Sequence, residues 1–166
     1  MITVEQVKEL RARTGLSVMQ CRKALDETGG DLDKAVALLK KAGVAAAEEK
    51  SDRSLGSGIV QSYIHSNGTI GSIVELSCET DFVAKNEEFK NLAYDIAMQV
   101  AATDPQFLKI EDMTSEAGEG TNDLVLAEQF FIKDPQRKIK DLITEAVQKF
   151  GERIEIRRFV RFSTQS

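Results

Sequence analysis

Residues 75–89 read ELSCETDFVAKNEEF, and within this stretch the chain changes from a strand to a helix. Residues 70–78 carry apolar side chains at alternate positions, which predicts a strand with one buried face. From residue 87 to residue 102, apolar residues recur at intervals of three and four, which predicts an amphipathic helix. The strand face consists of Ile70, Val74, Leu76 and Cys78. The helix stripe consists of Phe89, Leu92, Ala93, Ile96, Ala97 and Val100.

The corner between these two elements contains Thr80, Asp81 and Phe82. Thr80 or Asp81 can cap a helix by accepting a backbone N–H, and Phe82 can then staple the turn to the core. In the alternative arrangement, Phe82 points outward as a wedge beside an exposed carboxylate. The pattern of residues leaves both interpretations open.

Composition narrows the class of protein. The 166 residues suit one domain, or a small module plus a larger one. A hydrophobic content of 42% supports a packed core, and the net charge of −5 argues against a nucleic-acid-binding module. No apolar run reaches the length of a membrane span. Cys21 and Cys78 have neither zinc-site spacing nor a disulfide pattern, so we expect a reducing, cytoplasmic location.

Residues 1–43 predict a module of three short helices. Thr3, with Gln6 at the capping-box position, begins the first helix, while Ser17 and Asp31 begin the second and third. Gly43 is predicted to close the module. The inward positions are predicted to be Val4, Val7 and Leu10 in the first helix, Val18, Cys21 and Leu25 in the second, and Leu32, Ala35, Val36 and Leu39 in the third.

Residues 44–58 contain small, polar and charged residues and end in Gly56-Ser57-Gly58. This composition predicts a partly helical linker that ends in a flexible joint. We therefore expect a domain boundary here, with residues 59–166 forming a separate core domain.

The core domain is predicted to begin with a hairpin, in which Asn67-Gly68 forms a two-residue type I′ turn. Residues 106–135 carry no pattern that predicts an element. Residues 137–150 have the stripe of a helix, and residues 153–162 predict a final strand. On that strand, Ile154, Ile156, Val160 and Phe162 face one way, with Arg158 and Phe159 as exceptions to the alternation. The predicted class is α+β, with a three-stranded antiparallel sheet packed on helices.

Three motifs resemble the elongation factor Ts family, in the same order along the chain. They are residues 10–25, Tyr63-Ile64-His65 followed by Ile70-Gly71, and residues 75–85. The resemblance spans nearly the whole chain. It implies a translation factor that acts as guanine nucleotide exchange factor, binding elongation factor Tu and promoting release of GDP. It also implies that residues 1–43 form a ubiquitin-associated-like module.

The resemblance implies two partner-binding sites. In the family, the residues matching Asp81 and Phe82 enter the nucleotide-binding domain of the partner and disturb its magnesium site. The corresponding wedge here is Thr80, Asp81, Phe82 and Val83. The N-terminal module docks on the same partner domain, which suggests contacts from Leu16, Val18 and Met19. From the residues alone, Met19 could equally belong to the core.

The family also implies an oligomeric state. Its longer members carry two copies of the core, whereas short members pair as homodimers through the sheet, and open sheet edges invite pairing. We therefore expect a homodimer, in a complex of two exchange factors with two partners, without a cofactor or metal of its own.

Other functions fit the sequence less well than that of an exchange factor. No Walker A, GxSxG or HExxH motif is present, which argues against a hydrolase or transferase. The single histidine, His65, is expected to be structural rather than catalytic. A ubiquitin-associated-type adaptor remains open, because it would bind its partner without accelerating nucleotide release.

Overall fold

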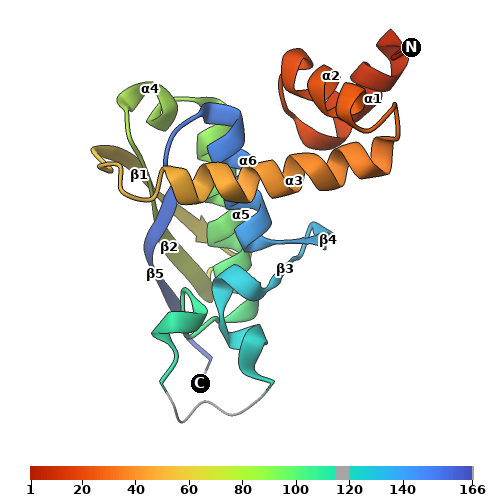
Figure 1. Ribbon diagram of the computed structural model, residues 1–166. Coiled ribbons are helices and arrows are strands. Elements are labelled where there is room, and N and C mark those ends of the chain that lie inside the picture. Colours follow the sequence, from red (N-terminus) through yellow and green to blue (C-terminus); the bar gives the residue numbers. More distant parts are fainter. Residues whose placement is uncertain (115–119, 166) are drawn as a thin grey trace. The chain divides into compact units, whose positions relative to one another are not determined.

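A computed structural model describes residues 1–114 and 120–165 of the chain. It has the predicted α+β class, with three N-terminal helices followed by a three-stranded antiparallel sheet and further helices (Figure 1). The helices are α1 Val4–Thr14, α2 Val18–Glu27, α3 Leu32–Glu49, α4 Asp81–Ala84, α5 Glu87–Thr103 and α6 Ile139–Phe150, with 3-10 turns η1 Ile110–Asp112, η2 Thr121–Leu124 and η3 Leu126–Glu128. The strands are β1 Ser57–Ile64, β2 Ile70–Cys78, β3 Phe130–Phe131, β4 Asp134–Lys138 and β5 Glu155–Ser163.

The first three helices begin where their caps predict. Thr3 and Gln6 form a capping box at α1, Ser17 and Gln20 form another at α2, and Asp31 accepts from the backbone of α3. Each cap satisfies a backbone N–H that has no partner within its helix. Together the helices enclose a small core made of Leu10, Leu16, Cys21, Ala24, Leu25, Ala35 and Leu39.

Two inward positions of the predicted module are wrong, and one helix runs further than expected. Val4 and Val18 are exposed, because neither packs into the small core that the three helices enclose. Helix α3 continues through Gly43 to Glu49. Gly43 is buried, and a Cβ there would lie 3.0 Å from Cγ2 of Thr144. The alanines that follow favour helix strongly enough to offset one glycine, which costs about 1 kcal/mol.

Residue contacts divide the chain into two compact units. One comprises Met1–Arg53 with Thr144–Arg153, and the other comprises Ser54–Ile143 with Ile154–Ser166. The first unit contains the three N-terminal helices, and the second contains the sheet together with α4 and α5.

The three-stranded sheet has the order β1-β2-β5, and α5 packs against all three strands. The predicted strand face and helix stripe meet at this interface. Of the predicted residues, Ile70 and Leu92 are half-buried, and those with no exposed surface are Val74, Leu76, Cys78, Phe89, Ala93, Ile96, Ala97 and Val100. The apolar alternation of β2 and the stripe of α5 are therefore confirmed as the core of the second unit.

The turn between β1 and β2 differs from the prediction. His65 N donates to Ile70 O and Gly68 N donates to His65 O, so the connection is longer than two residues. Gly68 has a φ of 70°, but Asn67 is not among the described non-glycine residues with positive φ. A type I′ turn requires positive φ at both positions. Instead, the Asn67 side chain accepts from the backbone N–H and the hydroxyl of Thr69.

A β-bulge in β5 changes which side chains face the core. Glu75 pairs with Arg158 and Leu76 pairs with Ile156, so Arg157 is an extra residue on β5. A bulge reverses the alternation beyond it. Arg161 consequently lies on the side of α5, where its Nε donates to Ala101 O at 2.9 Å. The predicted inward positions Val160 and Phe162 are wrong, since both lie on the opposite, outer face.

A short hairpin, β3–β4, occupies a stretch where the sequence predicts no element. Its pairing extends to Lys138, which is why α6 begins at Ile139 rather than at Arg137. The ammonium groups of Lys140 and Lys138 donate hydrogen bonds to the carboxylate of Glu128. These bonds, of which that from Lys140 has the larger effect, hold the pKa of the Glu128 carboxyl below its ordinary value.

Strand β1 begins at Ser57, within the Gly56-Ser57-Gly58 stretch that was predicted to form a flexible joint. A Cβ at Gly58 would lie 2.6 Å from Leu76 O and 3.0 Å from Cα of Ser77. Because both atoms belong to the backbone, a side chain cannot be accommodated without moving β2. The two glycines therefore allow a close approach of backbones.

Gly58→Ala is expected to lower the free energy of unfolding by about 1–3 kcal/mol, the usual cost of overpacking. Gly71→Ala is the matched control. Its Cβ would meet Cδ1 of Ile64, a flexible side-chain end, at 2.6 Å, so its loss should be smaller. Urea unfolding measures both. A loss in Gly71→Ala as large as that in Gly58→Ala would contradict the steric explanation.

Candidate functional site

The corner after β2 is a single helical turn, α4, which protrudes from the ribbon in Figure 1. Thr80 precedes it with extended backbone, and Asn86 then caps α5 by accepting from Glu88 N at 2.8 Å. Helix α4 thus begins at Asp81 and helix α5 begins at Glu87, only a few residues later. This leaves the first turn, α4, at the end of the sheet where β2 finishes and β1 begins.

Phe82 points into solvent with 91% of its surface exposed, whereas Val83 and Ala84 beside it are each only 8% exposed. The next two residues therefore anchor α4 to the core while the phenyl ring stands free of it. The interpretation of Phe82 as a staple is wrong. Because nearly all of the Phe82 side chain is in contact with water, it buries little apolar surface in the free chain.

The prediction that Thr80 caps the helix is confirmed only for its backbone. The Thr80 side chain makes no cap hydrogen bond at α4. Its backbone carbonyl accepts from Ala84 N at 3.2 Å and lies 3.3 Å from Sγ of Cys78. The backbone of Thr80 thus closes the turn, and its side chain stays at the surface.

Asp81 lies next to Phe82 with 75% of its side chain exposed. One carboxylate oxygen, Oδ1, accepts from the Ser57 hydroxyl at 2.6 Å, and Oδ2 lies 3.8 Å from Nζ of Lys85. No motif or spacing in the sequence identified Ser57 as part of the site. No local pattern could have done so, because the two residues are 24 positions apart and meet only through the pairing of β1 with β2.

The second predicted site lies at the start of α2, and its three residues differ in exposure. Met19 is 76% exposed and Val18 is 50% exposed, so Met19 does not belong to the core. Leu16 is 3% exposed and packs within the three-helix core. The surface offered by this module is therefore Val18 and Met19, without Leu16.

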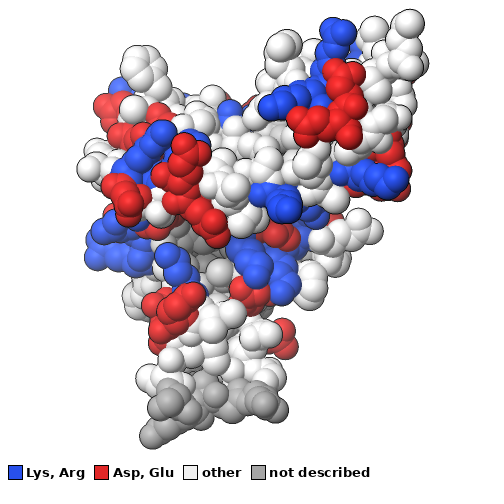
Figure 2. All heavy atoms as spheres, viewed as in Figure 1, with Lys and Arg blue, Asp and Glu red and all other residues white. Residues whose placement is uncertain are grey.

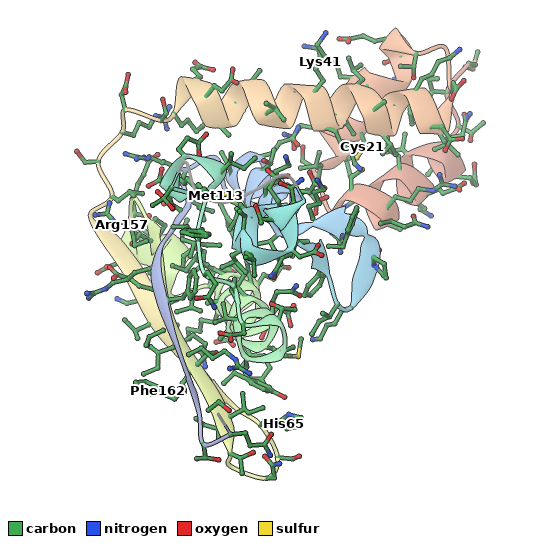
Figure 3. The ribbon with its side chains drawn as sticks, turned by 90° about the horizontal axis from the view of Figure 1, so that it is seen from below. Cys21, Lys41, His65, Met113, Arg157 and Phe162 are labelled. Atoms are coloured by element: carbon green, nitrogen blue, oxygen red, sulfur yellow. The ribbon has the colours of Figure 1, made fainter. Side chains whose placement is uncertain are left out.

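A third feature is the outer face of the sheet, on the side away from α5. Residues from all three strands line it: Val60, Ile64, Ile73, Val160 and Phe162, between 41% and 67% exposed. The strand pairing places Ile64, Gly71 and Phe162 in one row, and Ser62, Ile73 and Val160 in the next. Figure 3 shows Phe162 projecting from β5 on this side. The bulge at Arg157 adds Val160 and Phe162 to this apolar face by turning them outward.

The described residues also bear on four other kinds of site: a catalytic histidine, a metal site, a membrane span and a nucleic-acid-binding surface. Nδ1 of His65 lies 3.2 Å from the hydroxyl oxygen of Tyr63. Among residues 1–114 and 120–165, no group of histidine, cysteine and acidic side chains could hold a metal ion. No helix in the same part of the chain is long and apolar enough to cross a membrane. Figure 2 shows basic and acidic side chains interspersed on the face in view, unlike the continuous basic surface of a nucleic-acid-binding protein.

Along nearly its whole length, the chain is similar to known proteins. The family model for "Elongation factor TS" matches residues 46–129. A relative from Thermodesulfovibrio yellowstonii named Elongation factor Ts is 46% identical, over 97% of this chain and 95% of its own length. Relatives with the same name from Carboxydothermus hydrogenoformans and Herpetosiphon aurantiacus are 44% and 42% identical. They cover 98% and 99% of this chain, and 88% and 98% of their own lengths.

These similarities extend over both compact units, and they agree with the order of motifs and the α+β core. The chain belongs to the elongation factor Ts family of translation elongation factors.

Proposed function

We propose that the chain is the guanine nucleotide exchange factor of elongation factor Tu and that α4 is its active element. The observation that carries this proposal is the exposure of Phe82, at 91%, on a turn whose next two residues are buried. A ring held in water by a rigid support is suited to enter a pocket of another protein. Membership of the family supports the identity of the partner.

The proposed mechanism is differential binding. An exchange factor shifts a GTPase toward nucleotide release only if it binds the nucleotide-free state more tightly than the GDP-bound state. Insertion of Phe82 would supply apolar contact energy, and the Asp81 carboxylate beside it would disturb the ligands of the magnesium ion and the phosphates. Thr80 and Val83 would flank the insertion. This activity requires no covalent step, cofactor or metal from the chain itself.

The N-terminal module is proposed as a second anchor on the same partner. Val18 and Met19 are exposed apolar residues at the start of α2 and would form its contact. A second contact on the same chain increases avidity without adding to the disruption of the nucleotide site. We propose that residues 1–43 and residues 59–166 act as separate binding modules, joined by residues 44–58, whose two ends belong to helix α3 and strand β1. We also propose a cytoplasmic location.

Release of fluorescent GDP from purified elongation factor Tu tests the proposal. An excess of unlabelled GDP starts the reaction, and release is followed with increasing amounts of the chain and without it. We expect the release rate to rise with the concentration of the chain and to saturate. If the chain binds the partner while the release rate stays at its uncatalysed value, the protein is an adaptor instead.

We also propose a homodimer in which the outer faces of two sheets meet, in a complex of two chains with two partners. Five exposed apolar side chains on one face support this arrangement, because such a patch favours burial against a similar surface.

Ile73→Glu is expected to weaken this dimer at least tenfold, which corresponds to about 1.4 kcal/mol. Ile73 lies on the central strand with Ser62 and Val160 on either side, so a charge there would be buried without a partner. Ile132→Glu is the control, because its exposure of 44% matches the 42% of Ile73, and it lies outside the sheet. Sedimentation equilibrium measures both dissociation constants. Equal constants for the two variants would rule out this face as the interface.

A further inference from the structure

We propose that Ser57 is a positioning residue for nucleotide exchange, because its hydroxyl holds the Asp81 carboxylate in the orientation that meets the partner. This inference rests on the proposed function and assigns a role to a residue outside α4. The hydroxyl does not enter the nucleotide site itself. It acts through Asp81.

The contact between the two side chains is short and directed. Ser57 Oγ lies 2.6 Å from Oδ1 of Asp81, and since an ionised carboxylate has no hydrogen to donate, the hydroxyl is the donor. Such a length is typical of hydrogen bonds from a hydroxyl to a charged oxygen, which are stronger than neutral ones. The other polar neighbour, Lys85, lies 3.8 Å from Oδ2 with an exposed ammonium. An exposed ion pair of this kind contributes little.

The backbone around Ser57 explains why its side chain has a fixed position. Ser57 pairs with Cys78, immediately before the corner. A Cβ at Gly56 would lie 3.3 Å from Glu79 O, and one at Gly58 would lie 2.6 Å from Leu76 O. Glycine on both sides therefore lets this end of β1 lie against the chain that leads into α4. Ser57 thus belongs to a paired strand, which orients a side chain more precisely than a loop does.

The hydrogen bond has a consequence for binding. Three-quarters of the Asp81 side chain is exposed, so without Ser57 its carboxylate would rotate among several conformers. A group that already holds its bound conformation loses less entropy when the complex forms. Oδ2 and the remaining lone pair of Oδ1 stay available to groups of the partner, since one hydroxyl occupies only one acceptor position.

The test is a double-mutant cycle on GDP release from elongation factor Tu. Ser57→Ala is expected to slow release roughly three- to tenfold, the loss anticipated when one preorganising contact is removed. In an Asp81→Ala background, the same substitution should change the rate by less than about 1.5-fold, because no carboxylate remains to be held. Ser57→Thr keeps the hydroxyl and should restore most of the rate.

Ser66→Ala provides the matched control, since it removes an exposed serine hydroxyl from the turn at the far end of the hairpin. Its release rate should equal that of the wild type. Thermal unfolding of each variant shows whether a lost rate reflects lost structure. All the Ser57 variants are expected to unfold within a few degrees of the wild type.

The outcomes separate this assignment from the proposed function. If the wild type accelerates release and Ser57→Ala does so equally or faster, the positioning role is overturned while the exchange function stands. An equal loss from Ser57→Ala with and without Asp81 overturns it as well, because the effect would then be structural. If the wild type does not accelerate release at all, both the function and the assignment are overturned.

Discussion

Phe82→Ala is expected to slow the release of GDP from elongation factor Tu roughly 30-fold. Full burial of a phenylalanine side chain contributes on the order of 2 kcal/mol, and each 1.36 kcal/mol is a tenfold change in rate. The free chain does not gain this burial energy, because 91% of the surface of Phe82 is in contact with water. The loss should therefore appear in exchange and not in stability.

Phe130→Ala is a matched control for this experiment. Phe130 is also an exposed phenylalanine, at 59%, but it lies on the β3–β4 hairpin. Stopped-flow measurement of fluorescent GDP release should give the wild-type rate for Phe130→Ala and the reduced rate for Phe82→Ala. If both variants match the wild type, exchange does not depend on the ring, and α4 is only a well-anchored corner.

Phe89→Ala is expected to lower the free energy of unfolding by about 3–5 kcal/mol, the usual range for removing a buried phenylalanine. Phe89 lies in the first turn of α5 and has no exposed surface. It is also the largest of the fully buried side chains among the described residues. The cavity left by its ring would lie directly after the corner that carries Phe82.

Urea unfolding measures this loss, and Phe82→Ala serves as the internal control. Because Phe82 is a surface residue, its substitution should change the free energy of unfolding by less than about 0.5 kcal/mol. The two phenylalanines are seven positions apart, and comparing their variants distinguishes the residue that stabilises the fold, Phe89, from the exposed residue proposed to act on the partner, Phe82. A loss of less than about 1 kcal/mol in Phe89→Ala would mean that α5 does not depend on this side chain.

Features that depend on near neighbours in the chain could be predicted from the residues alone. The caps at Thr3, Ser17 and Asp31 are examples, because the acceptor and the backbone N–H that it satisfies are three residues apart. The strand β2 and the helix α5 were recognised by the periods of their apolar residues. Family membership followed from motifs that lie within such segments.

The wrong predictions have long-range causes. Val160 and Phe162 were assigned to the core because alternation was assumed to continue along β5. The bulge at Arg157 exists only in the pairing with β2. Gly43 was taken as a helix end, since close packing against Thr144 cannot be seen in the sequence. The Gly56-Ser57-Gly58 stretch was taken as a joint for a similar reason, because the backbone that the glycines approach lies about 20 positions away.

The sequence by itself therefore determined the class of fold and the starts of the N-terminal helices, because short-range hydrogen bonds and periodic apolar residues encode them. Its motifs determined the family of the protein. Only the tertiary structure decided which side chains of the corner face solvent. Phe82 could have been a staple or a wedge, and burial of Val83 and Ala84 against the core left it exposed. The partner of Asp81 was decided in the same way, since strand pairing alone brings Ser57 to it.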